Sequence, residues 1–241
     1  MCNRYFRDSD KQRLVEAFYL GDREDLPLEI APSYNIAPTT MQPVIVPDRD
    51  TGERSLRIMR WGLIPVWAKD PKAMGLSTMN AKAETLMEKP MWRTPFKKCR
   101  CLVPADGFYE WKKMDAKTKQ PYAFRLKDDG PFAFAGVWEH WKAPDGALEW
   151  DTYSIITTEP NEIAATVHNR MPVILKASDY GRWLDVGDTE HPPVDLLRPY
   201  DADKMTAYPV DPRVGNVRNN DPGLCEAYQS YQTHTDTDTL A

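Results

Sequence analysis

Cys2 directly follows Met1 and would become the N-terminal residue if Met1 were removed, which is usual when the next residue is small. Its α-amine and thiol would then lie on adjacent carbons and could attack one aldehyde twice, first forming a Schiff base and then a thiazolidine ring. An α-amine has a pKa of roughly 7.7–8.0, so about a tenth is unprotonated at neutral pH. Ring closure would be unimolecular, with an effective molarity on the order of 10⁵ M. Taken alone, a cysteine here is better explained as an accident of the start codon.

Three further residues have side chains suited to proton transfer or to positioning a reactive group. Strand periodicity in the aromatic segment 107–111 puts Glu110 on the face of Phe108, and apolar surroundings raise the pKa of a carboxylic acid. An exposed position or a lysine partner is the alternative for Glu110. His168 stands at a predicted helix-to-strand junction and could act as a general acid or base, or could cap or pack. Asn80 could hydrogen-bond a neighbouring backbone or cap a following helix.

Other side chains could bind a base or a phosphate. Trp61 and Trp67 flank a Gly/Pro turn, so an exposed one could stack on a base, whereas core packing is the alternative. Arg4 and Arg170 could bind phosphate or could be ordinary surface arginines. These alternatives cannot be separated from single residues, so the charge of whole segments matters.

The charge of the chain is unevenly distributed, although its net value is only −5. Residues 82–125 contain eleven Lys/Arg and five acidic residues, a net charge of +6, whereas residues 185–241 carry −7. This asymmetry is compatible with a groove that follows a phosphate backbone, and equally with a solvated basic loop.

The overall composition is that of a globular chain, with 241 residues, 41% hydrophobic and 28% charged. No apolar run is long enough to span a bilayer, and the N-terminus lacks the basic and apolar regions of a secretory signal. The four cysteines are few and unevenly spaced, so we expect the reducing cytoplasm rather than a disulfide framework. Cys99 and Cys101 lack the second ligand pair of a zinc site, so no metal or other cofactor is expected.

The elements that must position these residues indicate one mixed α/β (α+β) domain with a curved, barrel-like, largely antiparallel sheet and peripheral helices. Ser9, with Gln12 three residues later, predicts a helix N-terminus, and Gly21 its end. Further helices are expected over 160–167 and from about Ser178. Strands are expected at 44–46, 56–61, 101–104, 107–111, 122–126, 132–138, 153–157, 172–175 and 207–210. We expect the domain to cover residues 1–225, followed by a polar, disordered tail over 226–241.

In chain order, several short segments closely resemble the SRAP family, the SOS-response-associated peptidases or abasic-site processing proteins. The segments that carry the resemblance are Cys2 with Arg4, Tyr34-Asn35-x-Ala37-Pro38, Trp61-Gly62, Asn80-Ala81-x-Ala83-Glu84-Thr85, Ala105-Asp106-Gly107-x-x-Glu110-Trp111, His168-x-Arg170-x-Pro172 and Val214-Gly215-Asn216-Val217. One such motif alone is a weak signal, but the ordered set beginning at Cys2 is specific.

The resemblance implies a protein that senses abasic sites in single-stranded DNA, or at single-strand/double-strand junctions, during DNA repair and the SOS response. In such proteins the ring-opened sugar presents an aldehyde at C1′, and the cysteine forms a thiazolidine crosslink that protects the lesion. Carried over, Cys2 is the nucleophile, Asn80 positions its amine and the sugar, Glu110 shuttles protons, and His168 acts as acid or base in crosslink formation and reversal. The resemblance also implies DNA contacts at Arg4, Asn35, Pro38, Trp67, Lys82, Thr157 and Arg170.

Three positions depart from the family pattern. Asn3 stands where Gly is usual, which affects the close approach of the backbone. Lys82 replaces a frequent Arg and loses bidentate phosphate binding. Ala68 replaces a second tryptophan found in some members, which predicts a weaker stacking wedge.

Two other functions stay open at this stage. A thiol peptidase could use Cys2, His168 and Glu110 on protein substrates, or only on its own N-terminus. A DNA-binding module without chemistry is the third possibility. We expect a monomer without a membrane partner, associated with the nucleoid in a bacterial cell. The covalent hypothesis requires that Cys2 is accessible and close to Glu110 and His168.

Overall fold

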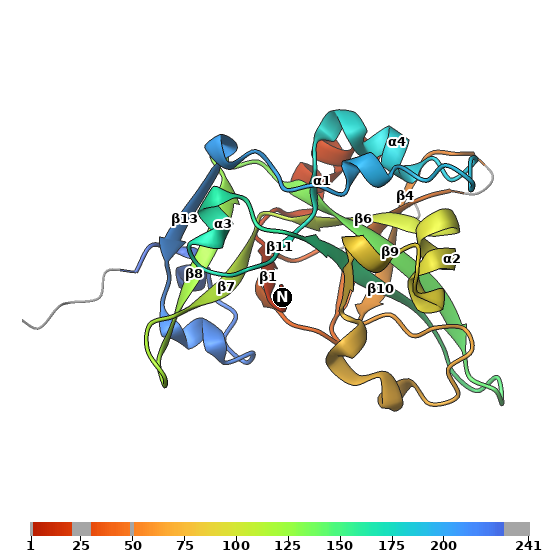
Figure 1. The fold of residues 1–241 in the computed structure, drawn as a ribbon, viewed down its shortest axis with the longest axis horizontal. Helices are drawn as coiled ribbons and strands as arrows, with labels where there is room; N and C mark the ends of the chain where they lie inside the picture. Colours follow the sequence, from red (N-terminus) through yellow and green to blue (C-terminus); the bar gives the residue numbers. More distant parts are fainter. Residues whose placement is uncertain (1, 21–29, 49–50, 229–241) are drawn as a thin grey trace, which may run out of the picture.

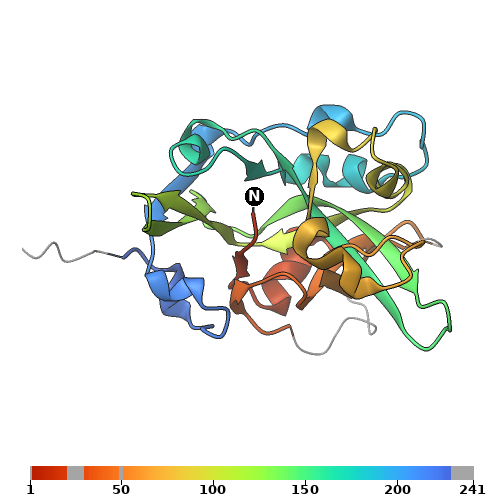
Figure 2. The same ribbon diagram turned by 60° about the horizontal axis from the view of Figure 1, so that its bottom comes forward.

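Two β-sheets dominate the computed structural model of the protein, which describes residues 2–20, 30–48 and 51–228. The order of strands in the first sheet is β13 (Met205–Pro209), β8 (Lys119–Leu126), β7 (Gly107–Lys113), β1 (Tyr5–Arg7) and β2 (Ser33–Ile36). All four pairings between these strands are antiparallel. Figure 1 shows β13, β8 and β7 on the left and β1 near the centre, and in Figure 2 the red N-terminal segment again lies near the middle of the molecule.

The second sheet closes on itself. Its ring contains β10 (Glu149–Thr158), β4 (Arg54–Trp61), β3 (Met41–Pro47), β6 (Arg100–Ala105) and β9 (Phe132–Lys142), and β9 pairs again with β10. The short strands β5 (Asn80–Lys82), β11 (Met171–Pro172) and β12 (Ile174–Leu175) are added to this barrel. Among the described strands, only β4 and β5 pair in parallel, both with β10. The predicted mixed fold with a barrel-like, largely antiparallel sheet is therefore confirmed.

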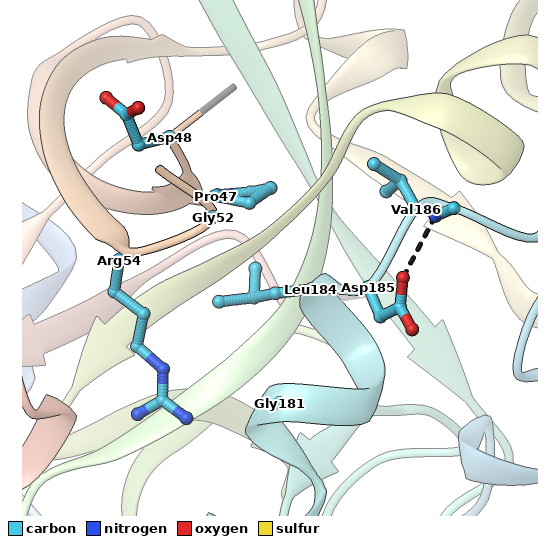
Figure 3. Close-up of a pocket in the computed structure, with 9 residues that line it drawn as sticks. Pro47, Asp48, Gly52, Arg54, Gly181, Leu184, Asp185 and Val186 are labelled. Atoms are coloured by element: carbon cyan, nitrogen blue, oxygen red, sulfur yellow. Dashed lines mark hydrogen bonds between the residues drawn. The ribbon is translucent and has the colours of Figure 1, made fainter. Parts of the chain in front are cut away.

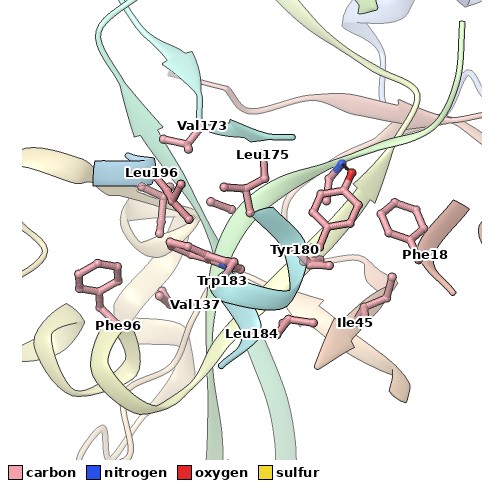
Figure 4. Packing of buried hydrophobic residues seen from close by; sticks show 14 of the residues in the cluster. Phe18, Ile45, Phe96, Val137, Val173, Leu175, Tyr180, Trp183, Leu184 and Leu196 are labelled. Atoms are coloured by element: carbon pink, nitrogen blue, oxygen red, sulfur yellow. Dashed lines mark hydrogen bonds between the residues drawn. The ribbon is translucent and has the colours of Figure 1, made fainter. Parts of the chain in front are cut away.

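Three helices pack on the outside of the barrel, where their apolar residues form one cluster with the strands: α1 (Lys11–Phe18), α2 (Pro90–Lys98) and α4 (Tyr180–Leu184). The short helix α3 (Glu162–Ala165) instead packs in a second cluster, which contains Cys2, and contacts β13. Figure 4 shows Phe18, Phe96, Tyr180 and Trp183 gathered around the same part of this core. The buried Arg100 donates to backbone carbonyls of Phe96 and Lys97 in α2 and of Trp183 and Asp185 at the end of α4. One cation thus satisfies the C-terminal carbonyls of two helices.

3₁₀ helices, most of them a single turn long, fill many of the connections. They lie at Pro71–Thr78, Ala83–Thr85, Ala177–Asp179, Val194–Leu196, Ala202–Lys204, Pro212–Gly215 and Pro222–Cys225. None of the helices in the described ranges has the length and apolar character needed to cross a membrane.

The predicted boundaries need several corrections. Asp10, rather than Ser9, caps α1, because its side chain accepts the N–H of Arg13 at 3.0 Å. The helix ends at Tyr19, which adopts a left-handed φ of 52°, whereas Gly21 lies outside the described residues. The helix expected over 160–167 is only the short α3, and β1, β2, β5 and α2 were not predicted. The tail predicted over 226–241 is described only as far as 228.

Candidate active site

Cys2 lies just before β1 and its side chain is buried, with an exposed fraction of 0%. Its Sγ is 3.8 Å from the carbonyl oxygen of Arg4. The Nδ2 of Asn80 donates a hydrogen bond of 2.6 Å to the carbonyl oxygen of Cys2. Asn80 is the first residue of β5 and does not cap a helix, so the other alternative, a bond to a neighbouring backbone, is confirmed. The structure therefore brings the two residues together but does not expose the thiol.

Glu110 reaches this region from β7, the strand that pairs with β1. Tyr109 donates its backbone N–H to the carbonyl of Arg4 at 2.9 Å, which joins β7 to the segment that follows Cys2. Glu110 is only 4% exposed, and burial raises its pKa to about 7, as its aromatic neighbours predict. Burial, with a further contribution from the charge of Glu110, also raises the pKa of the Cys2 thiol well above its usual value. Cys2 is therefore protonated at neutral pH, and Glu110 is poised to exchange protons.

His168 lies in the turn between α3 and β11 and is partly buried. The Nδ1 of His168 lies 3.1 Å from the backbone nitrogen of Arg170 and 3.3 Å from its carbonyl oxygen, so it accepts from the first or donates to the second according to the tautomer of the ring. Burial lowers the pKa of His168 below its usual value, and the charges of Lys119 and Arg170 act in the same direction. At neutral pH this residue is a neutral ring. It is not the cap at the C-terminal end of α3, because that position is Thr166.

The residues expected to touch DNA divide into exposed and buried groups. Trp67 is 62% exposed and Lys82 is exposed, whereas Pro38 is half-buried. Thr157 is fully buried, and its hydroxyl donates to the carbonyl of Ala81 at 3.5 Å. Trp61, the other tryptophan of the Gly/Pro turn, belongs to the core. Exposure therefore separates the two tryptophans, which the sequence alone left equivalent.

Arg4 and Asn35 are buried and bond to the protein itself. The Nη1 of Arg4 donates to Asn35 Oδ1 at 2.7 Å and to the carbonyl of Val214 at 2.9 Å. The Asn35 amide donates to the carbonyls of Val214, Asn216 and Asn219. The pair thus anchors the segment that contains the Val214–Val217 motif. Sequence reasoning missed this role, and a contact of either residue with DNA stays a prediction.

Glu84 was not predicted as a functional residue, although it lies in the motif that contains Asn80 and Lys82. Its two carboxylate oxygens accept bonds from the guanidinium of Arg170 at 2.5 and 3.0 Å. Arg170 donates in addition to the carbonyl of Thr157 at 2.6 Å. The position of Glu84 in the motif was the available signal, because its partner is 86 residues away.

A cavity of about 420 Å³ lies elsewhere. It is formed by the β3–β4 hairpin and the end of α4, and Figure 3 shows Arg54 and Asp185 at its wall. Arg54 is already engaged, since it donates to the carbonyl of Phe18 and lies over the ring of Tyr180. None of the predicted site residues lines this cavity, so we do not assign the reaction to it.

In the described part of the chain, no group of three or more His, Cys, Asp or Glu residues is arranged to hold a metal ion. Cys101 is buried in β6, where its Sγ packs against Gly136: a Cβ built on Gly136 would lie 2.8 Å from that sulfur. The alternative that Cys101 serves strand packing is confirmed.

Comparison with known proteins identifies the family. A family model described as SOS response associated peptidase (SRAP) matches residues 1–217. The chain belongs to this family. The abasic site processing protein YoqW of Bacillus subtilis is 44% identical to this SRAP chain over 230 residues, which is 95% of this chain and 100% of that protein. Mouse HMCES, also named an abasic site processing protein, is 32% identical over 92% of this chain and 74% of its own length. A crystal structure of a Bacteroides thetaiotaomicron protein superimposes with a TM-score of 0.82 at 28% identity, over 95% of this chain and 100% of the other.

Proposed function

We propose that this SRAP protein captures abasic sites in single-stranded DNA as a thiazolidine crosslink through Cys2, once Met1 has been removed. The observation that carries the proposal is the arrangement at Cys2, whose backbone is held by Asn80 and whose thiol is close enough to Glu110 for that charge to raise its pKa. The names of YoqW and HMCES support abasic-site processing as the general activity. The crosslink is our extension to the residues of this chain.

The chemistry follows from the two nucleophiles of an N-terminal cysteine. The α-amine adds to C1′ of the ring-opened sugar, and loss of one water gives a Schiff base. Sγ of Cys2 then adds to the same carbon, and the thiol proton ends on the nitrogen, which closes the thiazolidine. Glu110, with a pKa of about 7, can accept the thiol proton and return it to nitrogen. The imidazolium form of His168 can donate a proton to the hydroxyl that leaves as water, which returns the ring to the neutral imidazole.

Removal of Met1 is a strict requirement of this proposal. While Met1 is attached, the nitrogen of Cys2 is a peptide nitrogen and its thiol is buried, so neither group can react with DNA. Freeing the α-amine and docking the sugar must therefore also uncover Sγ. The same burial argues against a thiol peptidase that acts on other proteins, because the thiolate is the nucleophile and burial raises the pKa of Cys2.

We assign the DNA path to exposed residues at the rim. Trp67 can stack on a base, and Lys82 is the last residue of β5, two residues after the Asn80 that bonds to Cys2. The guanidinium of Arg170 is largely committed to Glu84 and Thr157, so it would have to exchange a partner to bind phosphate. A monomer in the cytoplasm, acting on the nucleoid of a bacterial cell, completes the proposal, together with a preference for single strands or junctions.

A crosslinking assay tests the proposal directly. Protein whose mass shows that Met1 is absent is incubated with a single-stranded oligonucleotide carrying one abasic site, and the products are heated and separated on a denaturing gel. We expect a heat-stable band, and we expect Cys2→Ala to abolish it, a loss of at least about 10³-fold, because no sulfur remains to close the ring. Cys99→Ala, a half-buried cysteine outside the site, is the matched control and should retain the band.

Two outcomes would contradict the proposal. One is a full heat-stable band from Cys2→Ala, and the other is no band from protein that is folded and lacks Met1. Cleavage of an added protein substrate that depends on Cys2 would instead support the peptidase.

A further inference from the structure

Glu84 and Arg170 join the two segments that supply Asn80 and His168. Both segments lie against β10, one on each side: Thr157 pairs with Lys82 of β5 and also with Pro172 of β11. The side chain of Arg170 must therefore cross β10 to reach Glu84, which follows β5 in the 3₁₀ turn Ala83–Thr85. An ion pair in this place can fix the distance between the two sides of the site.

The geometry of this pair is that of a strong interaction. The guanidinium of Arg170 donates to both oxygens of Glu84, and a third hydrogen bond, to the carbonyl of Thr157, fixes the plane of the guanidinium group. The side chain of Arg170 is only 16% exposed. Hydrogen bonding to Arg170 lowers the pKa of Glu84, so the carboxylate remains ionised at neutral pH. The exposed pair of Arg182 and Asp195 is also bidentate, and among the described residues Arg182 has no third hydrogen-bond acceptor, so this pair provides a natural comparison.

Arg170 also determines how His168 is held. Its backbone N–H and its carbonyl oxygen lie 3.1 and 3.3 Å from Nδ1 of the imidazole, so the backbone of Arg170 fixes the orientation of the ring and the balance between its two tautomers. The side chain of the same residue is bound to Glu84 on the other side of β10, so the position of the backbone of Arg170 depends on that ion pair. A contact at Glu84 is thus connected to the tautomer of His168 through one residue.

We propose that Glu84 is a positioning residue, which holds Arg170 across β10 and thereby sets the tautomer and orientation of His168. The effect on the reaction rests on the proposed function of this site, whereas the effect on the imidazole does not. Glu84 acts only through Arg170, and we assign it no contact with the sugar.

The test combines a spectroscopic and a kinetic measurement on the same samples. Long-range ¹H–¹⁵N correlation spectra of the histidine rings, with His168 assigned by its loss in His168→Gln, report which nitrogen carries the proton. We expect one tautomer to predominate in the parent protein and a mixture of tautomers in Glu84→Gln, with crosslinking slowed by about 10-fold to 10²-fold, because small misplacements of a catalytic group are that costly. Glu84→Asp should recover part of both properties, and Asp195→Asn should change neither.

The outcomes separate this inference from the proposed function. A parent protein that forms no crosslink would defeat the proposed function, yet the tautomer of His168 in Glu84→Gln would still decide the role of Glu84. An unchanged His168 spectrum in a folded Glu84→Gln protein would overturn the inference. Faster crosslinking by that variant with an unchanged spectrum would do the same, and would show that Glu84 competes with a DNA phosphate for Arg170.

Discussion

Asp106 and Glu110 belong to the same short segment, and each is a carboxyl group that is 4% exposed. Burial raises both pKa values, that of Asp106 to about 6 and that of Glu110 to about 7. Their surroundings differ. Asp106 accepts the backbone N–H of Ser9 at 2.8 Å and its hydroxyl at 2.6 Å, which fixes the chain after β1. Glu110 instead acts on the thiol of Cys2. Burial alone therefore does not mark a reactive carboxyl group, and the identity of its neighbours does.

The largest effect is expected at Glu110. Glu110→Gln keeps the size of the side chain but cannot accept a proton, so we expect crosslinking to slow by about 10²-fold to 10⁴-fold. Rates are measured by gel on folded protein without Met1. Glu139→Gln is the matched control, because burial also raises the pKa of Glu139 to about 7 but this residue lies on β9, outside the proposed site. Equal rates for Glu110→Gln and the parent protein would remove Glu110 from the mechanism.

The same variants make a prediction about stability and pH. The pKa of Glu110 is about 7 in the folded protein and 4.5 ordinarily, so the folded state favours the protonated form. Its contribution to the free energy of unfolding is complete below about pH 4.5 and is lost as the pH rises through about 7. The free energy of unfolding, measured by urea denaturation between pH 5 and 8, should therefore depend less on pH in Glu110→Gln than in the parent protein. The same is expected of Glu139→Gln. Only the first should also lose crosslinking.

Asp106→Asn should lower stability but leave crosslinking nearly unchanged, which is the opposite of the result expected for Glu110→Gln. Asp106→Asn retains one oxygen, so only one of the two donors of Ser9 can be satisfied, and the other is left buried without its acceptor. We expect the free energy of unfolding to fall by about 1–3 kcal/mol, measured by urea denaturation. Crosslinking per folded molecule should remain near that of the parent protein. A stable Asp106→Asn protein that has lost crosslinking would erase the distinction between the two carboxyl groups.

The sequence predicted the parts of this molecule that depend on local pattern. Alternating apolar residues located most strands of the barrel, and aromatic neighbours correctly indicated a raised pKa for Glu110. It failed where partners are far apart in the chain. Nothing near Ser9 shows that its partner is 97 residues away, and a helix cap is the ordinary local interpretation of that residue. The same holds for Arg4 with Asn35 and for Glu84, whose importance only the motif could suggest.

The smallest effect is expected at Ser9, where it tests which partner the hydroxyl serves. Ser9→Ala removes the hydroxyl but keeps the backbone N–H that donates to Asp106, so the loss should be about 1 kcal/mol, less than for Asp106→Asn. The Ser9 hydroxyl lowers the pKa of Asp106, so its removal should raise that pKa above about 6 and move the pH dependence of stability upward. Asp10→Ala is the control for a true cap of α1: it should cost a similar amount without this shift. An identical pH dependence in the two variants would mean that Ser9 stabilises the helix end rather than the buried carboxyl group.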